Sequence, residues 1–254
     1  MRKCAAFSNL GPSGSGIWYN THMIRLGILP AIALLYYIYR LDRVDKEPIG
    51  LIVRLFILGG VTIFGAMIVE RNLGNILLSI FGSDTSLLYQ ILFNFLVIAL
   101  TEEGFKFLVL RTVTWWRQEF NFRFDAVVYA AAVSLGFAAF ENVAYIFSFG
   151  GGVIIARALT AIPLHCIAGV FMGHYYGEGK FAAVRIQPDK SNLFLALSIV
   201  IPVLIHGFYD LVATLESGAL TLVFLVYIIV LDVIAIKCVK RYAAEDKPIH
   251  DVTW

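Results

Sequence analysis

Long apolar runs recur along the chain and are separated by short polar stretches. A helix needs about 20 consecutive apolar residues to cross a bilayer core, and seven runs are close to this length or longer. They lack the strict apolar–polar alternation of barrel strands. We therefore expect transmembrane helices at approximately 24–40, 49–69, 88–114, 126–149, 153–176, 192–214 and 218–239.

This pattern predicts an all-α membrane protein, a polytopic bundle of about seven transmembrane helices. Residues 23–240 form a single membrane domain, and 241–254 form a tail. The segment 8–16, SNLGPSGSG, reads as a flexible linker. We therefore interpret residues 1–22 as a tag, linker or non-native leader.

Composition supports a membrane location and excludes other classes. Hydrophobic residues make up 59% of the chain and charged residues 15%, whereas soluble domains carry about 25% charged residues. The net charge of +2 comes without a basic stripe interleaved with aromatics, so no nucleic-acid partner is expected. The three cysteines show no CxxC spacing, which argues against a disulfide framework or a cysteine-based zinc site.

The distribution of Lys and Arg predicts the orientation. Most of them lie in the loops after the first, third and fifth spans and in the C-terminal tail. Cytoplasmic loops carry the excess of positive residues. We therefore expect the N-terminus outside and the C-terminus in the cytoplasm.

Several ionisable residues fall inside the predicted spans. A charge near the bilayer centre costs about 2.5–3.5 kcal/mol on insertion scales, so such residues usually face the bundle interior and have a function. The third span carries two carboxylates and an amine, the fourth a carboxylate, the fifth an imidazole, and the sixth an imidazole and a carboxylate. These residues are Glu102, Glu103, Lys106, Glu141, His165, His206 and Asp210.

Their depths coincide. At 1.5 Å per helical residue, Glu102, Glu141, His165 and His206 each lie about 18–24 Å from the cytoplasmic end of their span. Scattered structural ion pairs have no reason to share one depth. The common layer therefore predicts one site built from four helices.

Local spacing suggests how these groups pair. Glu102 and Lys106 are four residues apart, as are His206 and Asp210, so each pair shares a helix face. Each pair taken alone is equally compatible with a buried salt bridge or a packing contact. Arg54 and Asp232 read as solvated or structural residues, and Arg157 is ambiguous.

Three motifs resemble a known family. EEGFK at 102–106, FAAFE at 137–141 and HGFYD at 206–210 match EExxK, FxxxE and HxxxD, and a DKEP stretch occupies Asp45–Pro48. With these motifs in order, residues 24–240 resemble the PrsW family of intramembrane proteases, which is related to the CAAX prenyl endopeptidases. Where Glu141 and Asp210 stand, the prenyl endopeptidases have His and Asn.

The resemblance implies hydrolysis of a membrane-tethered protein, such as an anti-sigma factor, in the bacterial cytoplasmic membrane. It implies functional roles for Glu102, Glu103, Glu141, His206 and Asp210.

We hypothesise a metal-assisted mechanism. Glu141, His165 and His206 would bind Zn²⁺, since three protein ligands plus water form the usual catalytic arrangement. One of Glu102 and Glu103 would act as general base, and the other would be a ligand or the partner of Lys106. Asp210 would hold the tautomer of His206.

Alternatives remain open at this point. A metal-independent glutamic mechanism would use Glu102 to activate water. A proton-coupled transporter could use the same carboxylate–histidine layer as a relay, although no internal repeat of the kind common in transporters is evident. A seven-helix receptor would have no need of a polar layer at this depth.

Overall fold

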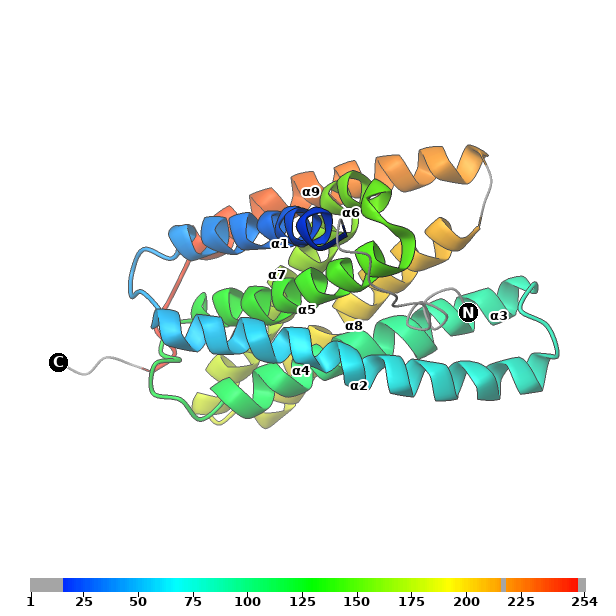
Figure 1. Cartoon of the computed structure of the whole chain (residues 1–254). Coiled ribbons are helices and arrows are strands. Elements are labelled where there is room, and N and C mark those ends of the chain that lie inside the picture. The colour runs from blue at the N-terminus through cyan, green and yellow to red at the C-terminus, as the bar shows by residue number, and fades with distance from the viewer. Residues whose placement is uncertain (1–15, 216–217, 251–254) are drawn as a thin grey trace.

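The computed structural model describes residues 16–215 and 218–250, and within these ranges it contains helices but no β-strand (Figure 1). The all-α prediction is therefore confirmed for the described chain. Residues 1–15 of the predicted leader lie outside the described residues. The helices are α1 (Gly16–Leu41), α2 (Ile49–Phe81), α3 (Leu87–Leu92), η2 (Phe93–Ala99), α4 (Leu100–Thr114), α5 (Asp125–Phe149), η3 (Gly151–Val153), α6 (Ile154–Leu159), α7 (Ala161–Val184), α8 (Pro188–Thr214) and α9 (Gly218–Ala244).

Among the described residues, six helical stretches are long and apolar enough to cross a membrane: 24–41, 49–81, 125–149, 151–184, 188–214 and 220–244. The span predicted at 88–114 is also helical, but it consists of α3, η2 and α4, which have 6, 7 and 15 residues. Length and composition therefore support six spans, and the seventh stays a prediction.

Helix α5 forms the centre of the bundle (Figure 1). In the most apolar stretch of α5, 89% of the residues are buried. The corresponding shares are 17% in α1 and 22% in α9. Small residues dominate the first part of α5, AVVYAAAVSLGFAA, and small side chains allow helices in lipid to approach closely. Helices α1, α2, α4 and α7 consequently pack against α5.

Glycines mark the closest helix contacts. A Cβ added at Gly136 of α5 would lie 1.9 Å from the carbonyl oxygen of Phe56 in α2, and one at Gly59 would lie 2.1 Å from the carbonyl oxygen of Val133. On the other side of α5, a Cβ at Gly173 of α7 would lie 2.4 Å from the carbonyl oxygen of Ala126. The sequence therefore sets the distances of α2 and α7 from the central helix.

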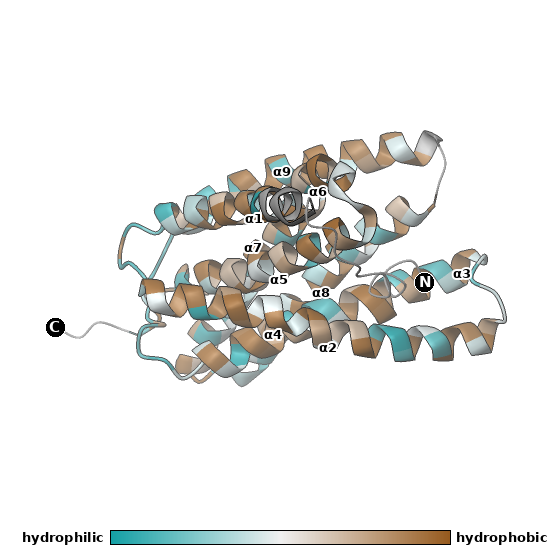
Figure 2. Cartoon of the chain, viewed as in Figure 1, coloured by the Kyte–Doolittle hydropathy of each residue, from teal (hydrophilic) through white to brown (hydrophobic). Residues whose placement is uncertain are grey.

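The α1–α2 loop, the α4–α5 loop and the C-terminal tail lie together at one end of the bundle (Figure 1). The side chain of Asn121 donates to Asp45 at 3.0 Å, and the amide of Ile249 donates to the carbonyl of Asn121 at 2.7 Å. Arg185, after α7, donates to the carbonyl of Ile249 at 2.9 Å. Hydrophilic residues gather in these loops, while hydrophobic residues cover the helices (Figure 2). The segments rich in Lys and Arg therefore share one end.

Candidate active site

The first turns of α4 carry three buried ionisable side chains. Glu102 is 2% exposed, and Glu103 and Lys106 are 0% exposed. The Nζ of Lys106 lies 2.7 Å from Oε1 of Glu103 and 3.7 Å from Oε2 of Glu102. The predicted pairing of Lys106 with Glu102 is present, but Glu103, one turn before it at i,i+3, is the closer partner. One ammonium group thus faces two carboxylates.

A π-helical segment, η2, precedes this turn. Such wider turns occur frequently at functional sites. In η2, Phe95 packs against α8 where that helix has a glycine, because a Cβ at Gly207 would lie 2.5 Å from the Phe95 ring. The absence of a side chain at Gly207 lets α8 approach η2 and α4 at the position of His206.

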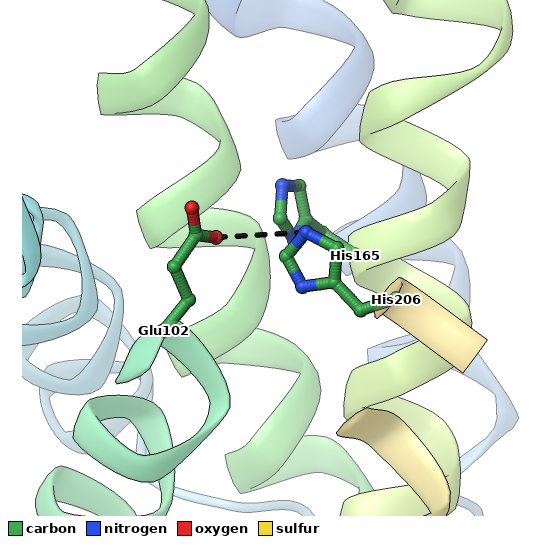
Figure 3. A group of neighbouring side chains, drawn as sticks. All are labelled: Glu102, His165 and His206. Carbon is green, nitrogen blue, oxygen red and sulfur yellow. Dashed lines mark ion pairs between the residues drawn. The ribbon is translucent and has the colours of Figure 1, made fainter. Parts of the chain in front are cut away.

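Two imidazoles complete the centre of the site. His165 of α7 and His206 of α8 are each 2% exposed, and their ring centroids are 5.0 Å apart with an interplanar angle of 88°. Together with Glu102, each offers one possible ligand atom, and these three atoms lie within 4.8 Å of one another. Figure 3 shows the three side chains from α4, α7 and α8 converging, with Oε2 of Glu102 at 3.8 Å from Nε2 of His206.

The hydrogen bonds indicate where the protons of His165 lie. Its Nδ1 is 3.0 Å from Nζ of Lys106, and its Nε2 is 3.0 Å from Oε2 of Glu141. An ammonium group donates only and an ionised carboxylate accepts only. Nδ1 of His165 therefore carries the electron pair, and Nε2 donates its proton to Glu141.

His206 lies among three carboxylates. Its Nδ1 is 2.9 Å from Oε1 of Glu103, and its Nε2 is 3.3 Å from Oδ2 of Asp210. If the ring is neutral and Nδ1 donates to Glu103, the electron pair of Nε2 faces the carboxylates of Asp210 and Glu102. Such an arrangement is favourable only when a proton or a metal ion lies between these atoms.

Glu141 lies at the edge of this group. Its Oε2 accepts from Nε2 of His165 and also from Nη2 of Arg157 at 2.7 Å. Phe137, one turn earlier in α5, lies beside Lys106, whose Nζ is 4.2 Å from the ring centroid. The ring of Phe137 forms an apolar wall behind the ammonium group, and the carboxylate of Glu141 faces the far nitrogen of His165.

The structure thus brings all seven predicted site residues into one connected group. The three residues that could hold a metal are Glu102, His165 and His206, whereas the predicted ligands were Glu141, His165 and His206 with Glu103. Glu103 and Glu141 instead contact the second nitrogen of His206 and of His165, respectively. Carboxylates commonly hold metal-binding imidazoles in this way.

The donor set and the charge of the site fit a divalent cation. Four carboxylates, Glu102, Glu103, Glu141 and Asp210, face two cationic side chains, Lys106 and Arg157, so carboxylates exceed cations by two when both imidazoles are neutral. Within the described part of the chain, Oε2 of Glu103 is buried without a hydrogen-bond partner. Two imidazoles and a carboxylate are also a common ligand set for catalytic zinc.

Sequence reasoning left two contributors unassigned, Arg157 and Asn142. Arg157 of α6 donates to Glu141, and its Nε donates to Oδ1 of Asn142 at 2.9 Å. A signal was available: an arginine inside an apolar span needs a carboxylate nearby. Glu141, in the preceding span, was the carboxylate closest to Arg157 in the sequence.

Comparisons with known proteins agree with these motifs. The model of a family described as "PrsW family intramembrane metalloprotease" matches residues 47–236. A protein named Protease PrsW from Oceanobacillus iheyensis is 35% identical over 219 residues, covering 86% of this chain and 95% of its own. Proteins of the same name from Bacillus subtilis (36% over 202 residues, 77% of this chain and 84% of theirs) and Clostridioides difficile (28% over 228 residues, 88% and 92%) are also similar. No solved structure matches.

Proposed function

Because this chain belongs to the PrsW family of intramembrane metalloproteases and is a peptide hydrolase, we propose that it cuts a membrane-tethered protein within the bilayer. The observation that carries this proposal is the convergence of Glu102, His165 and His206, from three helices, in a buried polar layer. Such a layer is costly in hydrocarbon. A protease requires such a layer, because hydrolysis brings water to a peptide bond that lies in the membrane.

A divalent metal, which we propose to be Zn²⁺, would be held by Glu102, His165 and His206. When bound, it would lower the pKa of a water molecule to about 7 and polarise the scissile carbonyl. Glu103 would hold the Nδ1 proton of His206, and Glu141 would hold the Nε2 proton of His165. Both contacts leave the electron pair of each ring on the other nitrogen. In His165 that nitrogen, Nδ1, accepts from Lys106 in the structure, so Lys106 would have to withdraw from it when the metal binds.

The remaining side chains have proposed roles in proton handling and charge balance. Glu102 lies among the ligand atoms, so it would either complete the ligand set or accept the proton of the attacking water, and both roles require its ionised form. Lys106 would neutralise Glu103 in the apolar surroundings. Asp210, whose Oδ2 lies 3.3 Å from Nε2 of His206, faces the nitrogen that would bind the metal, so its carboxylate would add negative charge beside the ion.

A metal-independent glutamic mechanism is the second candidate, because the site already contains a cation. The Nζ of Lys106 lies 2.7 Å from Glu103 and 3.0 Å from His165, so part of the negative charge is balanced without metal. In this version Glu102 would activate water, and His206 would contact the developing oxyanion. Chelation distinguishes the two mechanisms, since only the metal-assisted one loses activity.

The shared end of the basic loops supports a proposal for the orientation. We propose that this end, which contains the α1–α2 and α4–α5 loops and the C-terminal tail, lies in the cytoplasm, with α3–α4 as the seventh span. The substrate would then be a single-span protein, of which an anti-sigma factor is the suggested example, cut within or next to its span.

The test is cleavage of a single-span anti-sigma factor, tagged at both ends and reconstituted with the purified protein in liposomes. We expect two fragments, and a loss of rate of about 10²–10⁴-fold in Glu102→Gln. Full activity of both Glu102→Ala and Glu103→Ala would overturn the proposal. Proton flux across the liposome membrane without any cleavage would favour a transporter instead.

A further inference from the structure

The short helix α6 holds an arginine against the rear of the site. Arg157 donates to Oε2 of Glu141 at 2.7 Å and to Oδ1 of Asn142 at 2.9 Å, and its guanidinium lies 3.7 Å from the ring centroid of Tyr145. All three partners belong to one stretch of α5. The guanidinium is therefore held in one place by two hydrogen bonds and a stacking contact.

Arg157 sets the charge balance and the position of the Glu141 carboxylate. The same oxygen, Oε2, that accepts from Arg157 also accepts from Nε2 of His165 at 3.0 Å. The side chain of Glu141 is only 8% exposed, and an uncompensated carboxylate at this depth would be costly. Arg157 supplies the compensating charge and fixes the oxygen that receives the proton of His165.

The backbone around α6 is suited to this role. Thr160, between α6 and α7, has φ −127° and ψ −66°, so the helix is interrupted between Arg157 and His165. The hydroxyl of Tyr209 in α8 donates to Oγ1 of Thr160 at 3.0 Å. Asn142 donates to the carbonyl of Gly27 in α1 at 2.8 Å. The break allows Arg157 to turn toward α5, and contacts from α8 and α1 hold the assembly.

We propose that Arg157 is a positioning residue for peptide hydrolysis, acting through Glu141 on the orientation of His165. This inference rests on the proposed function. The chain of contacts runs from Arg157 to Glu141 and then to Nε2 of His165, so that Nδ1 of His165 keeps its electron pair facing the site.

A structural reading competes with this one, because Arg157 also joins α6 to α5. The two readings predict different results for a matched set of variants in the liposome cleavage assay. Arg157→Met removes both hydrogen bonds, Arg157→Lys keeps the charge, and Asn142→Ala removes the helix-joining contact while leaving Glu141 with its arginine. The double variant Arg157→Met/Glu141→Gln removes a cation and a carboxylate together, which keeps the charge of the layer unchanged.

We expect Arg157→Met to lower kcat by about 10–100-fold, the usual effect of losing a residue that supports a metal ligand, with little change in KM. Arg157→Lys should recover part of this loss, and Asn142→Ala, which removes one of the two hydrogen bonds of Arg157 but leaves its pair with Glu141, should lower kcat by less than Arg157→Met does. In the Glu141→Gln background, adding Arg157→Met should change kcat by less than about twofold, because residues that act through one another are not additive. Zinc affinity, measured by chelator competition, should fall by about 10–100-fold in Arg157→Met as well.

These outcomes distinguish a failure of the positioning role of Arg157 from a failure of the proposed protease function. If the wild type cleaves and the losses from Arg157→Met and Glu141→Gln multiply, or if Asn142→Ala is as damaging as Arg157→Met, the positioning role is wrong and Arg157 serves packing. If the wild type neither cleaves nor binds zinc, the proposed function fails instead.

Discussion

The Nζ of Lys106 lies 3.0 Å from Nδ1 of His165. This contact joins α4 to α7 and fixes the state of the imidazole, because an ammonium group can meet Nδ1 only when that nitrogen carries an electron pair. The same ammonium is 2.7 Å from Glu103, which in turn lies 2.9 Å from Nδ1 of His206. Lys106 and Glu103 thus connect the two histidines that the proposed chemistry requires.

Replacement of Lys106 should lower the free energy of unfolding while leaving the helices largely intact. Lys106→Met leaves the carboxylate of Glu103, which is 0% exposed, without its cation, and breaking a buried pair from one side costs about 3–5 kcal/mol. We expect this loss in unfolding experiments in detergent.

The charge-balanced variant Lys106→Met/Glu103→Gln is the control for this prediction. It should recover most of the lost free energy of unfolding because no unpaired charge remains. Equal stability of Lys106→Met and the wild type would show that the carboxylate of Glu103 is compensated by other groups.

Metal removal gives a second prediction. A strong chelator should abolish cleavage by the wild type, and stoichiometric Zn²⁺ should restore it, because Glu102, His165 and His206 form the ligand set that we propose. His165→Ala and His206→Ala should each retain much less zinc in elemental analysis of the purified protein. His174→Ala is a suitable control, since His174 stacks on Tyr242 with ring centroids 3.8 Å apart and is not in the ligand set. Cleavage that persists in chelator would instead support the metal-independent mechanism.

The sequence predicted the parts of the site that depend on length and depth. Apolar runs of bilayer length gave the helices, and counting residues from their cytoplasmic ends placed Glu102, Glu141, His165 and His206 in one layer. The structure brings these four residues together. Depth is predictable because the helical rise is constant and the membrane thickness is nearly so.

Direction around each helix axis could not be predicted in the same way. Depth placed Glu141 in the layer, but it did not indicate that Oε2 of Glu141 would contact Nε2 of His165 and the guanidinium of Arg157. The position of Arg157 depends on the interruption at Thr160, and the position of Glu102 follows the π-helical segment η2. Neither irregularity leaves a periodic signal in the sequence. The pairing of Glu103 with Lys106 also depends on rotamers, since i,i+3 and i,i+4 partners are both within reach.

The close contact of α2 with α5 leads to a third prediction. A Cβ at Gly136 would lie 1.9 Å from the carbonyl oxygen of Phe56, so Gly136→Ala must push the two helices apart. Overpacking of this kind costs about 1–3 kcal/mol, and we expect a lower melting temperature in detergent. Gly50→Ala is the matched control, because a Cβ at Gly50 meets nothing within 4 Å. Equal melting temperatures of the two variants would show that α2 moves away from α5 without a loss of stability.

At the end of the bundle where the loops meet, Glu47 lies in an acidic environment. Glu47 is 3% exposed, and its carboxylate accepts a hydrogen bond from the hydroxyl of Tyr129. Burial raises the pKa of Glu47 from 4.5 to about 7, against the lowering effect of the Tyr129 and Asp125 hydrogen bonds, and nearby Asp42 and Asp45 raise it further. Burial also raises the pKa of Asp42 to about 6, while Lys46 lowers it. Other charged groups around this cluster are Asp246 of the tail and Lys180 of α7, both of which interact with Asp125.

These raised pKa values predict how stability depends on pH. A carboxyl group whose pKa is higher in the folded state binds more protons when folded, so the free energy of unfolding falls as pH rises from about 4.5 to about 7. Glu47→Gln keeps an acceptor for Tyr129 without the charge. It should therefore weaken this pH dependence and raise the free energy of unfolding at pH 8 by about 1–2 kcal/mol. The measurement is unfolding in detergent at several pH values, with the exposed Asp84→Asn as control. A variant that is less stable than the wild type at pH 8 would mean that Glu47 is ionised in the folded protein and stabilised by its neighbours.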